Sequence, residues 1–118
     1  MWTEFEEHFV SRLRPLFPSH ADIRRTQPDG EICILVDWKL AGVTDRPNKR
    51  SRKLAIHICQ ETLEDYSAAS SPHRLSADER LVRHVSQLLS AFNPEHDAQY
   101  GMPEPCEEWV IQSSVVNV

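Results

Sequence analysis

Two short runs of alternating apolar residues constrain the fold of this chain more than any other feature. In both runs the apolar side chains fall at every second position, at Ile32, Ile34, Val36 and Trp38 and again at Leu54, Ile56 and Ile58. A period of two places such side chains on one face of a β-sheet. The sequence therefore predicts neighbouring strands over 31–40 and 53–60, joined by a polar loop.

An amphipathic helix is predicted near the N-terminus. Phe5, Phe9 and Leu13 repeat every four residues, which places them on one helical face. The segment Thr3–Glu6 has the spacing of a capping box, a common helix start. Because the prolines that follow cannot continue a helix, we expect it to span 4–14.

A longer helix is predicted in the second half of the chain. The segment Ser76–Glu79 again has capping-box spacing. After it comes an apolar stripe at helical spacing, formed by Leu81, Val82, Val85, Leu88, Leu89 and Phe92. These features predict a helix over 76–92, with Asp78 on its solvent side.

Shorter elements complete the prediction. We expect a strand over 21–26, a turn over 28–30, a short helix over 61–69 and a strand over 106–112. The tail after residue 112 would continue this last strand or fray. The predicted fold is α+β, with the order α-β-β-β-(short α)-α-β. It has an antiparallel sheet of about four strands and helices packed on one face, because the apolar face of the sheet needs a cover.

Composition and charge limit the classes of function. The chain has 118 residues, which suits a single α+β domain over 1–118. Its formal net charge of −5 argues against general attraction to nucleic acid or to an anionic membrane. No apolar window reaches the length of about 20 residues that spans a bilayer. The acidic N-terminal segment Met1–Glu7 is unlike a secretory signal. We expect a cytoplasmic protein without a membrane partner.

The cysteines are interpreted as free thiols in a reducing compartment. There are three of them, widely spaced and without a C-x-x-C pair. If the central strands pair residues whose numbers sum to about 92, Cys33 faces Cys59 across the sheet. Registers shifted by two residues are equally compatible with the alternation.

Motifs for catalysis or cofactor binding are absent from the sequence. The three glycines are far apart, so no glycine-rich phosphate loop can form. A metal site formed by Cys33, His57 and Cys59 is geometrically conceivable, but alternate positions on one strand diverge from tetrahedral geometry. The simpler interpretation of His57 is a partly exposed strand residue. We therefore predict no enzyme activity, no catalytic residue, no metal and no cofactor.

The sheet face opposite the apolar one is the first candidate binding surface. Alternation places a mixed set of side chains there, with Cys33, Leu35, Asp37, His57 and Cys59 as its candidate partner-binding residues. This set is more apolar than an ordinary solvent face, so it predicts binding of a protein partner or of a second copy as a homodimer. The alternative is that the N-terminal segment or the C-terminal tail partly covers this face.

The loop between the two central strands is the second candidate. Basic residues are concentrated there, at Arg46, Lys49, Arg50, Arg52 and Lys53. A cationic projection of this kind can bind phosphates or an acidic protein segment. The alternative is that a hairpin tip is simply polar, and that lysines there discourage aggregation of strands.

Three resemblances bear on the interpretation. The order helix, three strands, helix is similar to that of double-stranded-RNA-binding domains, but their basic start of the second helix is replaced by Ser76-Ala77-Asp78-Glu79. Small acidic secretion chaperones, which bind partners without catalysis, have a similar order and a further helix. The segments Val36–Lys39, Arg46–Arg52 and Leu63–Tyr66 resemble a family of small uncharacterised proteobacterial proteins of unknown function.

These observations predict a non-catalytic binding or accessory protein. It would act through the mixed sheet face and the basic loop, with a protein partner or itself. The alternative is a nucleic-acid-associated regulator that uses the basic segment Arg46–Lys53.

Overall fold

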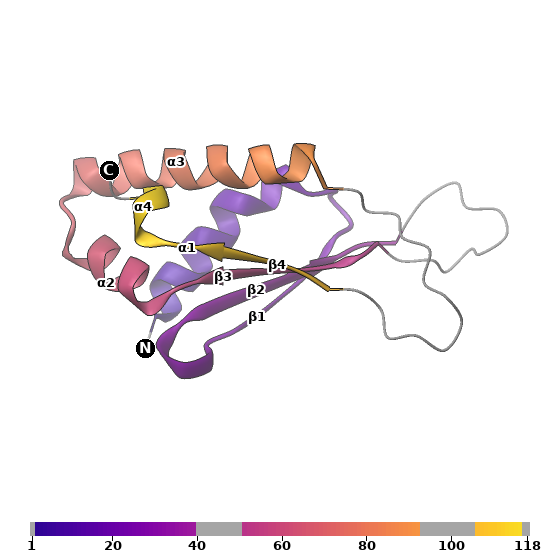
Figure 1. Ribbon diagram of the computed structural model, residues 1–118, viewed down its shortest axis with the longest axis horizontal. Helices are drawn as coiled ribbons and strands as arrows, with labels where there is room; N and C mark the ends of the chain where they lie inside the picture. Colours follow the sequence, from indigo (N-terminus) through magenta and orange to yellow (C-terminus); the bar gives the residue numbers. More distant parts are fainter. Residues whose placement is uncertain (1, 40–50, 93–105, 117–118) are drawn as a thin grey trace, which may run out of the picture.

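The computed structural model describes residues 2–39, 51–92 and 106–116 (Figure 1). The elements in chain order are α1 (Thr3–Leu13), the 3-10 turn η1 (Arg14–Leu16), β1 (Asp22–Thr26), the 3-10 turn η2 (Pro28–Gly30), β2 (Ile32–Asp37), β3 (Lys53–Ile58), α2 (Gln60–Ala68), α3 (Ser71–Ser90), β4 (Cys106–Ile111) and α4 (Ser113–Val116). The predicted α+β class is confirmed, with most element boundaries within one or two residues of the prediction.

The four strands form one sheet in the order β1-β2-β3-β4. Strands β1, β2 and β3 are antiparallel neighbours, whereas β4 pairs in parallel with β3. The prediction of a purely antiparallel sheet is therefore wrong. The helices α2 and α3 lie between β3 and β4, and a helical crossover returns the chain to the end at which the previous strand began.

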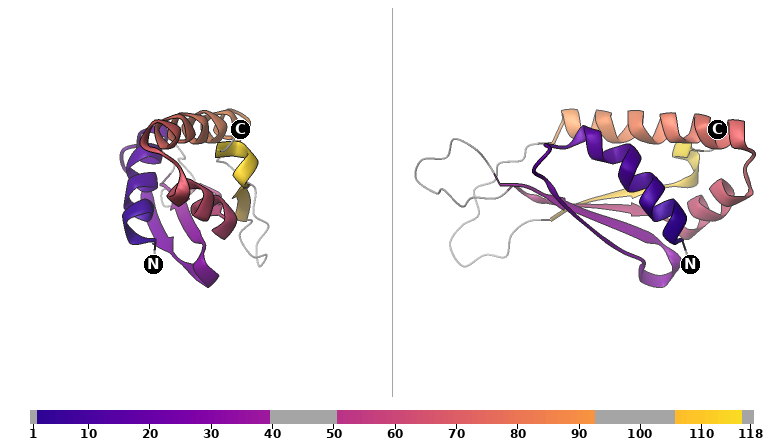
Figure 2. Two further views of the ribbon diagram at one scale, coloured as in Figure 1. Left: turned by 90° about the vertical axis from the view of Figure 1, so that its left-hand side faces the viewer. Right: turned by 180° about the vertical axis from the view of Figure 1, so that it is seen from behind.

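The helices α1 and α3 lie on one side of the sheet, as Figures 1 and 2 show. On β2 and β3 the side chains that alternate toward these helices are buried and form the core with residues of α1, α2, α3 and β4. From the strands, this core contains Ile32, Ile34, Val36, Leu54, Ile56, Ile58, Trp109 and Ile111. The predicted apolar face and its helical cover are both present.

Neither predicted capping box forms. Helix α1 begins at Thr3 without a side-chain cap, and the Glu6 carboxylate instead binds Arg25 and Gln27 on and after β1. Helix α3 begins at Ser71, so Ser76 lies inside it. Pro72 explains the earlier start, because proline is well suited to the first turn of a helix.

Two further details differ from the sequence interpretation. Asp78 is buried against α1 and α2 and does not face solvent. The residues after β4 form the short helix α4, which packs against α2 and α3, so they neither extend the strand nor fray over 113–116. Among the described helices, none is both long enough and apolar enough to cross a bilayer.

Candidate functional site

The side of the sheet that faces away from α1 and α3 is called the outer face. Hydrogen-bonded register places its side chains in rows that run across all four strands. One row consists of Thr26, Cys33, His57 and Val110, and the next consists of Arg24, Leu35, Ala55 and Glu108. The middle of each row comes from β2 and β3, while the ends lie on the edge strands β1 and β4.

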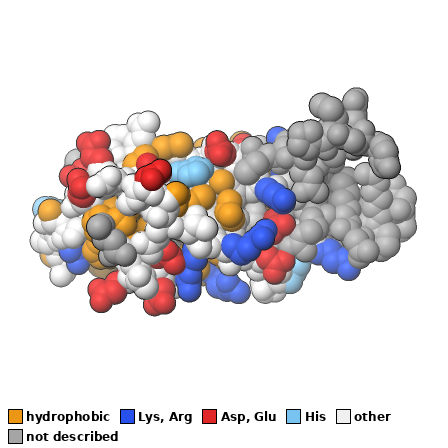
Figure 3. All heavy atoms as spheres, turned by 90° about the horizontal axis from the view of Figure 1, so that it is seen from below, with side chains coloured by type: hydrophobic (Ala, Val, Ile, Leu, Met, Phe, Trp, Pro, Cys, Tyr) orange, Lys and Arg blue, Asp and Glu red, His pale blue; other side chains and the backbone are white. Residues whose placement is uncertain are grey.

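The outer face has a small apolar centre. Ala55 and Cys33 are buried, and Leu35, which lies beside Ala55 in the second row, is half-buried. Val110 is 52% exposed and is one of two large hydrophobic residues that the described chain leaves in solvent. The other, Leu75, lies far from this face on α3. Figure 3 shows hydrophobic side chains beside a histidine, with charged side chains of both signs around them.

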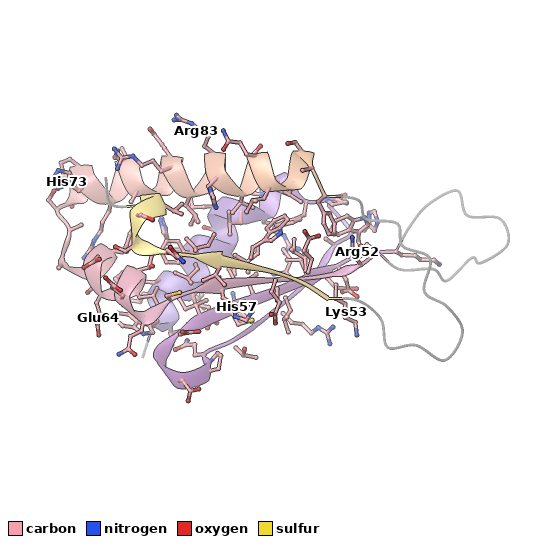
Figure 4. The ribbon with its side chains drawn as sticks, viewed as in Figure 1. Arg52, Lys53, His57, Glu64, His73 and Arg83 are labelled. Atoms are coloured by element: carbon pink, nitrogen blue, oxygen red, sulfur yellow. The ribbon has the colours of Figure 1, made fainter. Side chains whose placement is uncertain are left out.

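His57 lies within this apolar centre and approaches an acidic neighbour. Its side chain is 25% exposed, and Nε2 lies 3.6 Å from Oε1 of Glu108 on the adjacent strand. This distance is too long for a good hydrogen bond. Figure 4 shows His57 on the side of the sheet away from α3. The pair therefore contributes a polar group and an accessible negative charge to the edge of the apolar centre.

In the structure, paired residues of β2 and β3 have numbers that sum to 90, so the register is shifted by two residues from the one that would place Cys33 opposite Cys59. Cys33 is paired with His57, and Cys59 lies one position beyond the end of β3, at the start of α2. Neither of these two cysteines forms a disulfide. The described residues contain no group of three His, Cys, Asp or Glu side chains suited to a metal ion. Cys33, His57 and Cys59 thus do not converge.

The environment of Cys59 favours its neutral thiol. Burial raises its pKa, and the negative charges of Glu31 and Glu61 raise it further. A nucleophilic cysteine needs the opposite environment, because the thiolate is its reactive form. Cys59 is therefore suited to contact and packing at the end of the outer face.

The structure brings together only part of the predicted partner-binding set. Cys33, Leu35 and His57 share the outer face on β2 and β3. Asp37 points to the same side but is buried, so it offers little accessible surface. The N-terminal segment and the C-terminal tail were the alternative covers of this face. Their described parts lie elsewhere, since α1 packs on the other side of the sheet and α4 contacts α2 and α3.

The predicted basic site falls mainly outside the described residues. Arg46, Lys49 and Arg50 lie in the undescribed range 40–50. Arg52 and Lys53 are described, and they point to opposite sides of the sheet because they are adjacent in the sequence (Figure 4). These two cations therefore do not form one patch.

The base of this hairpin is closed by a buried serine. The amide of Trp38 donates to Oγ of Ser51 at 3.0 Å, and the amide of Ser51 donates to the carbonyl of Trp38 at 2.7 Å. Ser51 is itself buried. The two central strands are thus held together immediately before the undescribed segment begins.

Sequence reasoning missed the edge-strand residues of the outer face. Alternation in 106–112 placed Trp109 and Ile111 on one face, which leaves Glu108 and Val110 on the other. Arg24 and Thr26 follow from the same rule in β1. Their place beside Leu35 and His57 could not be assigned, because strand order and register were not fixed.

A second polar cluster was also missed, between the helices. The buried Asp78 accepts hydrogen bonds from the Tyr66 hydroxyl at 3.0 Å and from Nε2 of His8 at 2.8 Å. The guanidinium of Arg74 lies 5.5 Å from the ring centroids of Phe5 and Tyr66. Because these residues come from α1, α2 and α3, the cluster joins the helices to one another.

Comparison with known proteins found no protein-family model, no curated protein and no solved structure that matches this chain. The resemblance to small proteobacterial proteins stays a prediction. The outer face of the sheet is the candidate site with the most described residues.

Proposed function

We propose that this chain is a non-catalytic binding or accessory protein whose protein-binding surface is the outer face. The main support is the contrast between the two sides of one sheet. Helices cover the inner side, whereas the outer side leaves Val110 exposed and Leu35 half-buried beside the buried Cys33 and Ala55. Apolar centres with a polar rim are typical of surfaces that bind proteins.

The charges around the centre support specific binding over general adhesion. Arg24 is exposed at one edge, and Glu108, with 66% of its side chain exposed, stands at the other. Opposite charges at the rim select a partner and fix its orientation. The widely spaced cysteines without a C-x-x-C pair favour a reducing, cytoplasmic site of action.

A pair of matched variants tests this function. Val110→Arg places a charge on the outer face, and Leu75→Arg places the same charge on the exposed surface of α3. Tagged wild-type chain and both variants are recovered from the native cell, and the proteins that accompany them, including untagged copies of this chain, are quantified. The proposal requires an association that Val110→Arg abolishes and Leu75→Arg leaves intact.

Two outcomes would contradict the proposal. One is an association that survives Val110→Arg unchanged, since the partner then binds elsewhere. The other is retention of DNA or RNA by the purified chain that is lost in the double variant Arg50→Glu/Arg52→Glu and unaffected by Val110→Arg. This second outcome would establish the nucleic-acid alternative, in which the segment Arg46–Lys53 is the binding site.

A further inference from the structure

We propose that the partner of the outer face is a second copy of this chain, related by a two-fold axis that runs nearly parallel to the strands. This inference rests on the proposed function and specifies its partner. Its basis is the arrangement of size and charge along the rows of the sheet.

The symmetry operation determines which strands meet. A two-fold axis along the strands, between β2 and β3, places β1 of one copy opposite β4 of the other and β2 opposite β3. Positions along the strands are preserved, so residues of one row meet residues of the same row. Packed sheets keep their strand directions within about 30° of one another, so a small tilt of the axis accommodates the twist.

The row with opposite charges at its ends is complementary to itself under this operation. In the second copy the same row runs in the opposite direction, so each residue faces a different member of the row Arg24, Leu35, Ala55 and Glu108. Arg24 of one copy then lies opposite Glu108 of the other, and the larger Leu35 lies over the smaller Ala55. The two-fold axis repeats both contacts, so each dimer contains two ion pairs and two apolar contacts.

The neighbouring row is also compatible with this arrangement. It places the exposed Val110 opposite Thr26, whose side chain offers a methyl group, and the buried Cys33 opposite His57. The exposed Val110 would thereby lose its contact with water. No like charges meet in either row.

The other two-fold axis in the plane of the face is disfavoured by the same residues. An axis across the strands through this row would place Arg24 opposite Arg24 and Glu108 opposite Glu108. Like charges that meet directly at an interface cost several kcal/mol. The charge pattern therefore selects the axis along the strands.

The area of the face sets the expected affinity. Four strands spaced by about 4.8 Å, with about six residues of about 3.3 Å each, give a face of about 19 by 20 Å. This footprint of about 380 Å² per copy is below the roughly 800 Å² per partner of a standard specific interface and suits a weak, transient association. We therefore expect weak, reversible dimerisation that depends on protein concentration.

A charge exchange tests the inference. The purified full-length chain, Arg24→Glu, Glu108→Arg and the double variant are compared by sedimentation equilibrium over a range of concentrations. Each single variant should weaken dimerisation about tenfold or more, because two like-charge contacts replace two ion pairs. The double variant should recover most of the wild-type affinity, because the exchanged charges again meet their opposites.

Recovery in the double variant cannot arise within one chain. Arg24 and Glu108 are separated by three strand spacings, about 14 Å, in the same sheet. Arg83→Glu is the matched control, since this exposed arginine lies on α3 and points away from the sheet (Figure 4). It should dimerise like the wild type.

The outcomes separate this inference from the proposed function. A chain that is monomeric at every concentration overturns the inference. The proposed function then stands if Val110→Arg still abolishes binding of another protein in the cell. A dimer that none of the outer-face variants weakens also overturns the inference, because its interface then lies elsewhere. Weakening without recovery in the double variant overturns the assigned axis.

Discussion

Tyr66 donates a hydrogen bond of 3.0 Å to Oδ1 of Asp78, and this contact joins α2 to α3 in the interior of the protein. The other oxygen of the same carboxylate accepts a hydrogen bond of 2.8 Å from His8 on α1. Asp78 is only 4% exposed. A buried carboxylate is tolerated when its oxygens have hydrogen-bond partners, so the three helices depend on one another at this point.

Removal of the Asp78 carboxylate should destabilise the fold. Asp78→Ala leaves the buried Tyr66 hydroxyl without its acceptor, and we expect the free energy of unfolding to fall by about 2 kcal/mol. Urea unfolding followed by circular dichroism measures this change. Glu79→Ala is the control, because Glu79 is exposed on the same helix. Equal effects of the two substitutions would mean that the contact does not contribute to stability.

The same contact predicts a loss of stability at alkaline pH. Burial raises the pKa of Tyr66, and the hydrogen bond to Asp78 with the charge of its carboxylate raises it further. Above the ordinary tyrosine pKa of about 10, only the unfolded chain releases this proton. The folded state then binds more protons, so its stability falls as the pH rises.

The variant Tyr66→Phe isolates this effect. It should lower stability at neutral pH, because a hydrogen bond is lost, but it should also reduce the further loss at high pH. We expect the wild type to lose about 1 kcal/mol more than the variant between about pH 9 and about pH 11. Parallel stability curves for the two proteins over this range would show that Tyr66 ionises equally well in the folded state.

The N-terminal helix is held to the sheet by a separate polar network. Glu6 is buried, with Oε1 at 3.1 Å from Nε of Arg25, and its Oε2 accepts a hydrogen bond of 2.7 Å from Gln27. The indole of Trp2 donates to the carbonyl of Gly30 at 2.6 Å. These contacts connect the start of α1 to β1 and the turn that follows it.

Glu6→Ala should therefore destabilise the protein, whereas Glu4→Ala should not. We expect a loss of about 1 kcal/mol at residue 6, a modest value because Arg25 remains 42% exposed and water screens its charge. Glu4 is exposed and provides the control. Chemical denaturation of both variants gives the comparison. If Glu4→Ala proved as costly as Glu6→Ala, the network around Glu6 would not be the cause.

The Cys59 thiol should react slowly in the folded protein. Its pKa is raised by burial and by the charges of Glu31 and Glu61, so less thiolate is present near pH 8 than in the unfolded chain. A variant with Cys33→Ser and Cys106→Ser leaves this thiol as the only one. Labelling by a disulfide reagent should be faster in denaturant than in its absence. Equal rates would contradict the environment described for Cys59.

The sequence was sufficient to predict the central strands and their buried face. Isoleucine and leucine at every second position assign the same face of both runs to the interior, and the helical stripe at Leu81 and Val85 provides the cover. The direction of β4 could not be predicted in the same way. It depends on the path of the α2–α3 crossover, and this path is not encoded in the strand itself.

The capping boxes show why local motifs were less informative. Ser76 and Glu79 have suitable spacing, but Pro72 allows α3 to begin five residues before Ser76. Asp78 would be a solvent residue in an isolated helix. Its burial requires Tyr66 and His8, which lie elsewhere in the sequence and meet it only in the folded chain.

The sheet face that carries the candidate site could be predicted from the sequence, but the full set of residues on that face could not. Alternation assigned Leu35 and His57 to the outer face, and the structure confirms that they share it. The exposed apolar side chain and the rim charges come from β1 and β4, at Arg24, Glu108 and Val110. Their positions relative to the centre depend on strand order and register, which are properties of the whole sheet.

Site-specific photocrosslinking in the native cell tests the central claim, that the outer face binds a protein. A benzophenone amino acid replaces Val110 in one variant and Leu75 in another, since both side chains are large, apolar and exposed. The account predicts a discrete adduct from position 110, at twice the 13.6 kDa of the chain and mapped near Thr26 of the second copy, and none from position 75. No adduct from position 110, or the same adduct from both positions, would contradict it.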